Sequence, residues 1–315
     1  MKRVSLAVAV AVIFAGTQLT LGQGRGNPFV DHTDNGETIH VLPPQASVHS
    51  PRDTDPTDAP PHNGAAVYAA SYGSGKLTNH GGPVMGNAQF QAIYWNSSLA
   101  SDIQGTIDGF VSTFSDNQPY SNTDKTADFT IVQQYTLAYL LTARSSYVDA
   151  SHDHQRVPSS YSDASVRNYV ASLFASGNVA PATDTIYGVY FPSGMRISSQ
   201  GGGSCSSFCG YHGHFSYGGM DIKYAVFPYT DCRACSLPGK RVIDILTIVT
   251  SHEIREAATD PDLNAWFDSQ GYEADDKCAW HNLYQTTTGG YWVQPEYSNG
   301  NGNNPYPGPG CVVPN

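Results

Sequence analysis

The side chains with the clearest chemical potential lie at the end of a long apolar segment. Residues 241–261 read RVIDILTIVTSHEIREAATDP, in which His252 and Glu256 are four positions apart and Glu253 lies between them. Side chains four apart on a helix project from the same face, one turn from each other. Zinc accepts both imidazole nitrogen and carboxylate oxygen, so this pair predicts a divalent metal site.

A second acidic group follows the predicted helix. Residues 271–278 read GYEADDKC and include Glu273 and Asp276. We expect Glu273 to be the third ligand, with Asp276 either the actual third ligand or the acceptor that orients His252. Glu253 would then stand beside the metal and accept a proton from water, as in the HExxH zinc peptidases, with glutamate replacing the second histidine.

Two alternatives compete with a metal site. Chance is a weak one, because 11 His and five Glu in 315 residues predict an HExxE pattern about 0.003 times. The stronger one is an exposed helix end on which Glu253, Arg255 and Glu256 form only surface ion pairs. Residues 242–249 favour a buried helix, because they are apolar on nearly every side.

The HExxE pattern also changes the charge of the predicted site. One histidine and two carboxylates neutralise a zinc ion, whereas two histidines and one carboxylate leave a net positive charge. A neutral site is the weaker Lewis acid. The site could therefore hydrolyse slowly, hold another divalent metal, or serve only to stabilise the fold.

Hydrophobic patterning supplies the elements that must position these residues. Strands and helices alternate along one stretch without an internal repeat, which predicts a single α/β (α+β) domain, a mixed sheet packed on the buried helix, with a loop-rich C-terminal part. The predicted strands are 89–95, 185–191, 212–217 and 224–229, and the predicted helices cover residues 103–114, 163–175 and 242–258; residues 129–141 are either strand or mixed.

The first 64 residues differ in composition from the predicted domain and divide into two segments. Residues 1–22 show the plan of a signal peptide, with Lys2 and Arg3 before an apolar run. As a membrane anchor, the thirteen apolar residues would reach only about 20 Å, short of a bilayer core of about 30 Å. Residues 23–64 are rich in Pro, Asp, His and Asn, which predicts a flexible linker or propeptide, or alternatively a segment wrapped on the domain surface. The domain would then comprise residues 65–315.

Composition narrows the partners and the compartment. Charged residues make up only 14% of the chain and the formal net charge is −11, so nucleic acid is a poor partner. After removal of residues 1–22 we expect no membrane segment and a secreted, extracellular or periplasmic protein. The six cysteines predict three disulfides in such a compartment. We favour Cys205–Cys209, Cys232–Cys235 and Cys278–Cys311 among fifteen possible pairings; a zinc site on the first four thiols is the alternative.

Several segments resemble the plant EXORDIUM, or phosphate-induced, protein family and its secreted bacterial and fungal relatives. The similarity covers residues 80–278 and includes NHGGPVMGNAQFQAIYW at 79–95, TIYGVYFPSG at 185–194, SCSSFCGYHGHF at 204–215, YAVFPY at 224–229, SHEIREAATDP at 251–261 and EADDKC at 273–278. Plant members are described as cell-wall proteins that promote growth, without an agreed enzymatic activity. The helix motif resembles that of the zincin metallopeptidases, which implies a zincin-like fold.

The resemblance adds candidate residues from the GYH block. In a zincin-like fold a strand before the active helix lines the cleft, so Tyr211, His212 or His214 could bind substrate or stabilise an oxyanion, with His212 the first choice. Alternatively, all three simply pack on a strand beside the disulfides.

Three functions follow as hypotheses. The first is a secreted zinc-dependent metallopeptidase acting on polypeptides. The second is a non-catalytic cell-wall-associated protein with a structural metal, which binds polysaccharide or a protein partner through its aromatic surface. The third is a glycoside hydrolase that uses Glu253 and Glu273 as acid and base, which leaves His252 without a role.

Overall fold

The central element of the computed structural model is an eight-stranded mixed sheet with the strand order β1-β2-β12-β13-β9-β5-β6, in which β7 also pairs with β5. The structure describes residues 26–48, 57–60, 65–114, 130–136, 140–300 and 307–314. The middle of the sheet is parallel and consists of β5 (Asn87–Tyr94), β9 (Thr185–Tyr190) and β13 (Met220–Phe227). Strand β12 (Gly210–Tyr217) runs antiparallel to β13.

The two edges of the sheet come from distant parts of the chain. At one edge, β6 (Leu140–Ala143) and β7 (Tyr147–Val148) run parallel to β5. At the other, β2 (Thr38–Leu42) pairs antiparallel with β12, and β1 (Val30–His32) pairs with β2. The N-terminal hairpin therefore covers the edge that β12 would otherwise expose.

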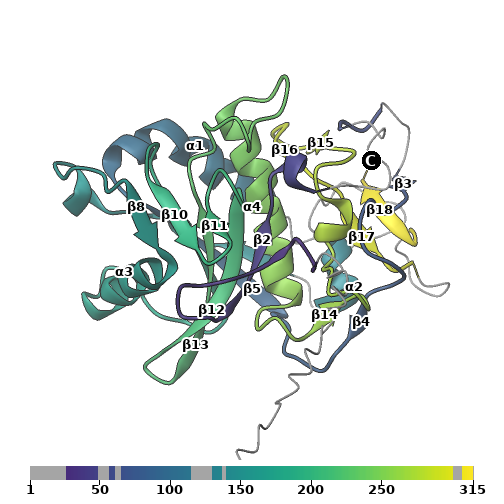
Figure 1. Cartoon of the computed structure of the whole chain (residues 1–315), viewed down its shortest axis with the longest axis horizontal. Coiled ribbons are helices and arrows are strands. Elements are labelled where there is room, and N and C mark those ends of the chain that lie inside the picture. The colour runs from purple at the N-terminus through teal and green to yellow at the C-terminus, as the bar shows by residue number, and fades with distance from the viewer. Residues whose placement is uncertain are drawn as a thin grey trace, which may run out of the picture.

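Helices cover both faces of the sheet (Figure 1). Helices α1 (Ser97–Phe114) and α4 (Val242–Thr259) contact each other and pack on one face, where the Tyr190 hydroxyl lies 2.9 Å from the Thr250 hydroxyl. Helix α3 (Asp163–Ala175) lies on the other face and accepts a 2.8 Å hydrogen bond from Tyr211 through its first residue. The predicted arrangement of a mixed sheet on a buried helix is confirmed.

Helix α4 is buried over almost its whole length. The Asp244 carboxylate caps the first turn of the helix by accepting a hydrogen bond from the Arg241 amide at 2.8 Å. Asp260 and Pro261 end it, as predicted. Because Glu253, Arg255 and Glu256 are all fully buried, the alternative of an exposed helix end with surface ion pairs is wrong.

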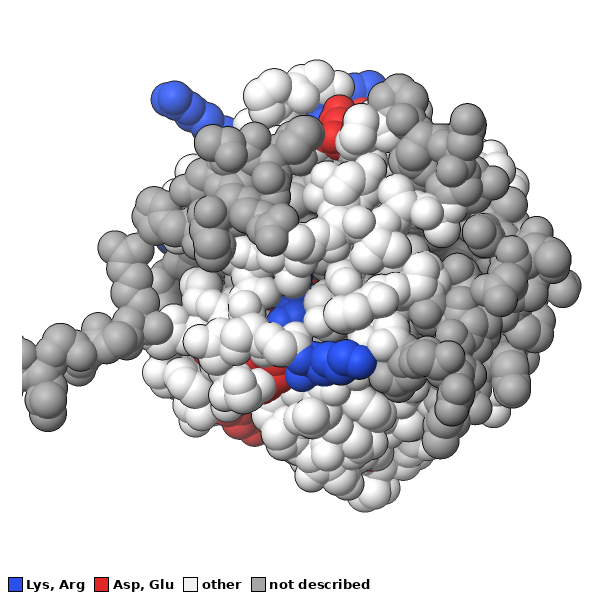
Figure 2. Space-filling model, turned by 90° about the vertical axis from the view of Figure 1, so that its right-hand side faces the viewer, with Lys and Arg blue, Asp and Glu red and all other residues white. Residues whose placement is uncertain are grey.

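The remaining elements are short, and those after α4 build the loop-rich C-terminal part. Strand β18 (Gly310–Val313) pairs with β17 (Glu296–Ser298) and β3 (Ala66–Tyr68), so the C-terminal tail belongs to a small sheet. The other elements are β4 (Thr78–Asn79), α2 (Gln133–Thr136), β8 (Ser160–Ser162), β10 (Arg196–Ser199), β11 (Gly202–Gly203), β14 (Trp266–Phe267), β15 (Tyr284–Gln285), β16 (Trp292–Val293), and 3₁₀ turns at Gln45–Ser47, Thr130–Val132, Ala150–His152 and Asp276–Cys278. Figure 2 shows the side of the molecule that lies on the right in Figure 1, where few of the described residues are charged.

Part of the segment predicted as a flexible linker or propeptide forms strands in the structure. Residues 26–48 enter the main sheet, and Phe29, Ile39, Val41 and Leu42 are each no more than 2% exposed. The alternation in Thr38–Leu42 provides enough apolar surface for a strand, although the segment as a whole is polar. The predicted signal peptide, residues 1–22, lies outside the described residues.

The structure contains three disulfides, Cys205–Cys232, Cys209–Cys235 and Cys278–Cys311. The third pairing is confirmed, whereas the predicted local pairs Cys205–Cys209 and Cys232–Cys235 are wrong, as is the zinc alternative. Each local segment forms a tight turn closed by a backbone hydrogen bond. The Cys205 amide donates to the Phe208 carbonyl, and the Cys235 amide donates to the Cys232 carbonyl. The two turns lie against each other, so each cysteine faces the opposite turn. Three disulfides indicate an oxidising compartment.

No helix within the described residues combines the length and apolar character that a membrane crossing requires.

The disulfide pairing can be checked by proteolysis without reduction. Chymotrypsin can cut after Phe208, between Cys205 and Cys209, and trypsin can cut after Arg233, between Cys232 and Cys235. We expect mass spectrometry of the denatured, doubly digested chain to find Cys205 linked to Cys232 and Cys209 linked to Cys235. Peptides in which Cys205 is linked to Cys209 would contradict this pairing.

Candidate metal centre

The histidine and the two glutamates of the HExxE motif lie on the part of α4 that faces β12. His252 Nε2 is 3.0 Å from Glu256 Oε2, as the one-turn spacing predicts. Glu253 Oε2 is 3.2 Å from Nδ1 of His212 on β12. Both elements are held rigidly by their packing in the core, so these side chains have fixed positions.

The loop at residues 271–278 brings the predicted acidic residues to the same place. The Asp276 amide donates to Glu256 Oε1 at 2.9 Å, and the Glu273 amide donates to Asp276 Oδ2 at 2.9 Å. Asp276 Oδ1 is 3.8 Å from His252 Nε2, and Glu273 Oε2 is 3.9 Å from His212 Nε2. The structure therefore brings together six of the candidate residues: His212, His252, Glu253, Glu256, Glu273 and Asp276.

A seventh residue, His40 on β2, was missed by the sequence analysis. Its Nδ1 lies 2.9 Å from Glu273 Oε1 and 3.7 Å from Asp276 Oδ2. Strand β2 places it directly opposite His212 in the antiparallel register. The signal was present in the alternating sequence TIHVL at 38–42, but the polar composition around it concealed the strand.

We call these seven side chains the buried cluster: His40, His212, His252, Glu253, Glu256, Glu273 and Asp276. His40 is 6% exposed and the other six are fully buried. Although imidazole and carboxylate atoms approach closely, many of them lack a hydrogen-bond partner. These atoms are His40 Nδ1, His212 Nε2, both nitrogens of His252, Glu253 Oε1, Glu256 Oε2, both oxygens of Glu273 and Asp276 Oδ1.

The spacing of these atoms fits a divalent cation. Two ligands of one tetrahedral zinc ion, each about 2.1 Å from the metal, lie about 3.4 Å apart. The nitrogen–oxygen separations in the buried cluster are 2.9 to 3.9 Å. Ligand atoms of His212, Glu253 and Glu256 all lie within 4.8 Å of one another, as do those of His40, Glu256 and Asp276. A cation would offset the cost of burying these unpaired atoms.

Burial dominates the electrostatics of the buried cluster. Desolvation lowers the pKa of His40 to about 3 and that of His252 to about 4, and lowers the pKa of His212 well below its usual value. The imidazoles are therefore neutral near pH 7, the form that binds metals. Desolvation and mutual repulsion raise the pKa values of Glu253, Glu256, Glu273 and Asp276 well above normal.

Neighbouring residues hold the frame around the buried cluster. The Arg255 guanidinium donates to Asp275 at 2.9 Å through Nε and to the Gln294 carbonyl at 2.8 Å through Nη2. Arg255 and Asp275 are both fully buried. This ion pair joins α4 to the 271–278 loop on the side away from β12, so it fixes the loop that carries Glu273 and Asp276.

The other candidate residues lie elsewhere. The Tyr211 hydroxyl points to the opposite face of the sheet and bonds Asp163, so its packing role is the correct interpretation. His214 Nδ1 is 2.9 Å from Asp221 at the more exposed end of β12. His281, three residues after Cys278, also lies outside the buried cluster, with its Nε2 3.4 Å from the Tyr72 hydroxyl.

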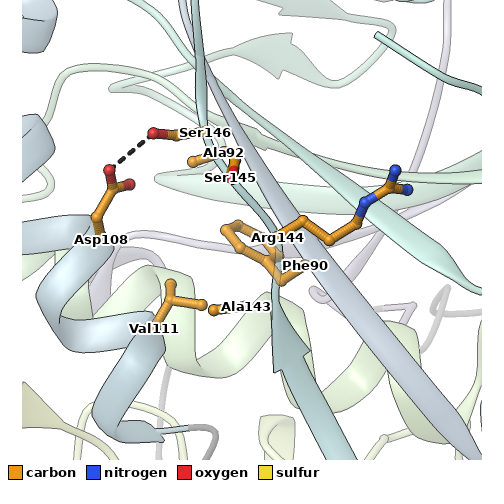
Figure 3. Close-up of a pocket in the computed structure, with 8 residues that line it drawn as sticks. All are labelled: Phe90, Ala92, Asp108, Val111, Ala143, Arg144, Ser145 and Ser146. Carbon is orange, nitrogen blue, oxygen red and sulfur yellow. Dashed lines mark hydrogen bonds between the residues drawn. The ribbon is translucent and has the colours of Figure 1, made fainter.

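A separate pocket lies between α1 and strands β5 and β6 (Figure 3). It has a volume of about 400 Å³, and none of its lining residues belongs to the buried cluster. Asp108 accepts a 2.7 Å hydrogen bond from Ser146 at its wall, and the Arg144 guanidinium points away from Asp108. The pocket and the buried cluster are therefore different places in the fold.

Comparisons of the chain with protein-family models, with curated proteins and with solved structures find no match. The geometry of the buried cluster is therefore the basis for a functional proposal.

Gly210 allows β12 to approach α4 beside Glu253. A Cβ at this position would lie 2.3 Å from Val249 Cγ1 and 3.1 Å from Glu253 Oε1. We expect Gly210→Ala to lower the free energy of unfolding by about 1–3 kcal/mol through overpacking, measured by chemical denaturation. Gly105→Ala is the control, since it has open space on helix α1 and should be neutral or stabilising. Equal stability of Gly210→Ala and the parent would contradict this packing.

The pKa shifts predict how the metal-free protein responds to pH. Between pH 7 and pH 8.5 the three histidines of the buried cluster are largely neutral in both the folded and the unfolded chain, so the carboxylates of the cluster make the main difference. Their raised pKa values mean that the folded state retains protons that the unfolded state releases, and stability is lost as pH rises. We expect the melting temperature of chelator-treated protein to fall between pH 7 and pH 8.5. An increase over this range would contradict the ionisation state described here.

Proposed function

We propose that this protein is a secreted zinc-dependent peptidase, or one using another divalent metal, whose active centre is the buried cluster. The observation that supports it best is the convergence of neutral imidazoles and unpaired carboxylate oxygens at 2.9–3.9 Å around the HExxE motif of α4. His212 on β12 supplies a second imidazole beside His252, and His40 adds a third while β2 is in place, which answers the concern that one histidine and two carboxylates make a weak Lewis acid.

The residues of the cluster divide into two roles. His252 and Glu256 would hold the metal with Glu273 or Asp276, and His40 or His212 could complete the ligand set. When bound, such a metal polarises a carbonyl group and makes a water molecule more acidic. Glu253 is the proposed general base, because it lies one residue from His252 and its Oε1 has no hydrogen-bond partner.

His212 is the second proposed catalytic residue. Its Nδ1 lies 3.2 Å from Glu253 Oε2 and 3.9 Å from Glu256 Oε2. It can therefore position the base and pass a proton to or from it, or serve as a ligand. The oxyanion role considered from the sequence requires an accessible Nε2, which instead faces Glu273.

A structural metal in a non-catalytic protein is the second candidate. The specific observation in its favour is burial, because the cluster side chains are at most 8% exposed and a substrate cannot reach them in this conformation. The resemblance to the EXORDIUM family favours the same alternative. A glycoside-hydrolase mechanism is not proposed, since it gives the three imidazoles no role.

Substitution of the base separates these functions. We expect Glu253→Gln to retain the parent's metal stoichiometry, measured by elemental analysis, and to lose activity on unfolded casein by at least 10²-fold. His252→Ala should lose the metal itself. Asp102→Asn is the control, because this carboxylate is exposed on α1 and should leave both readouts unchanged.

The outcomes differ between the candidates. Undiminished casein cleavage by Glu253→Gln would rule out the proposed base. A bound metal whose removal lowers the melting temperature, without hydrolysis in any form of the chain, would support the structural alternative.

A further inference from the structure

The residues that close the buried cluster come from one N-terminal segment. We call residues 26–48 the strap. Its strand β2 lies against both β12 and α4 (Figure 1). The antiparallel register pairs His40 with His212, Val41 with Tyr211, and Leu42 with Gly210. The strap therefore lies along the stretch of β12 that borders the HExxE motif.

The strap contacts the proposed catalytic groups through its backbone and one side chain. The backbone amide of Leu42 lies near the Glu253 carboxylate and favours its ionised form, against the larger effect of burial. His40 contributes an imidazole nitrogen 2.9 Å from Glu273. Gly210, opposite Leu42, has no side chain that could separate the strand from Glu253. An extended peptide thus lies directly over the proposed base.

The strap completes an edge of the sheet but is not covalently tied to it. All three disulfides lie between Cys205 and Cys311, so none of them includes the strap. Strands β12, β13, β9, β5 and β6 form a continuous sheet without it. Without the strap, β12 would present an unpaired backbone edge beside Glu253, which is the geometry that accepts an extended peptide by strand addition.

We propose that the edge of β12 above Glu253 is a binding groove for an extended polypeptide, and that the strap occupies this groove as an inhibitory segment of the same chain. This inference rests on the proposed peptidase function and names its substrate class. A substrate would pair antiparallel with β12 in the place of Thr38–Leu42 and bring a peptide bond to Glu253. The form described here is then the latent one.

The contacts of the strap indicate which features of a peptide ligand the groove would recognise. Main-chain hydrogen bonds from the edge of β12 do not depend on sequence. Ile39 and Val41 alternate with His40 and are nearly fully buried, so apolar side chains at alternate positions should strengthen binding. The expected ligand is therefore an extended or unfolded polypeptide with alternating apolar residues.

Cutting the folded chain tests the inference. A recognition sequence for a site-specific protease is inserted between Ser50 and Pro51, outside the described residues, and the chain is cut after folding. Before cutting, the variant with the inserted site must show the parent's melting temperature.

Binding to the cut chain is measured with a fluorescent synthetic peptide of residues 26–48, which is added in excess and followed by fluorescence anisotropy. The matched control peptide carries an N-methyl group on Leu42, which removes the backbone N–H of the residue that pairs with Gly210 and lies near Glu253.

We expect the peptide to exchange into the cut chain but not the uncut one, and the N-methylated peptide to bind at least tenfold more weakly. Casein hydrolysis should rise at least tenfold on cutting and be suppressed by the added peptide. Absence of exchange, or equal binding of the two peptides, would overturn the groove.

The two proposals fail separately. Exchange with the expected N-methyl effect but no casein hydrolysis would leave the groove standing and reject the peptidase. Casein hydrolysis that is the same before and after cutting, and that the added peptide does not suppress, would keep the peptidase and reject the strap as its inhibitor.

Discussion

Seven ionisable side chains share one enclosed volume at the junction of α4, β12, β2 and the 271–278 loop, and most of them have polar atoms without a hydrogen bond. Removing such groups from water costs several kcal/mol each unless something compensates them. Protons on the carboxylates are one compensation, and a divalent cation shared with the neutral imidazoles is another. The surrounding fold holds these groups close together despite this free-energy cost.

That frame depends on contacts made by groups outside the cluster. The Asp276 amide fixes one oxygen of Glu256, and the Arg255–Asp275 ion pair joins the same loop to the other side of α4. Gly210 allows β12 to pack directly on the helix beside Glu253. Each contact limits the freedom of a proposed ligand or base, which is the preorganisation that metal chemistry requires.

The sequence predicted the helix, the main strands and six of the seven cluster residues, because each carries a local signal. The apolar run before His252 indicated burial, and the one-turn spacing to Glu256 brought the pair together. His40 could not be found this way, since its short strand lies within a segment of polar composition and its partner strand begins 170 residues later, at Gly210. The cysteine pairing also failed, because spacing along the chain does not reveal which turn lies against which. Long-range pairing requires the tertiary structure.

The disulfide between Cys278 and Cys311 bears on when the centre can be completed. Cys278 lies two residues after Asp276, and its partner is in the final strand of the chain. In a reducing environment the acidic loop would lack this anchor, so two of the carboxylates would be poorly placed. Oxidation of this cysteine pair would thus come before the acidic loop takes the position described here.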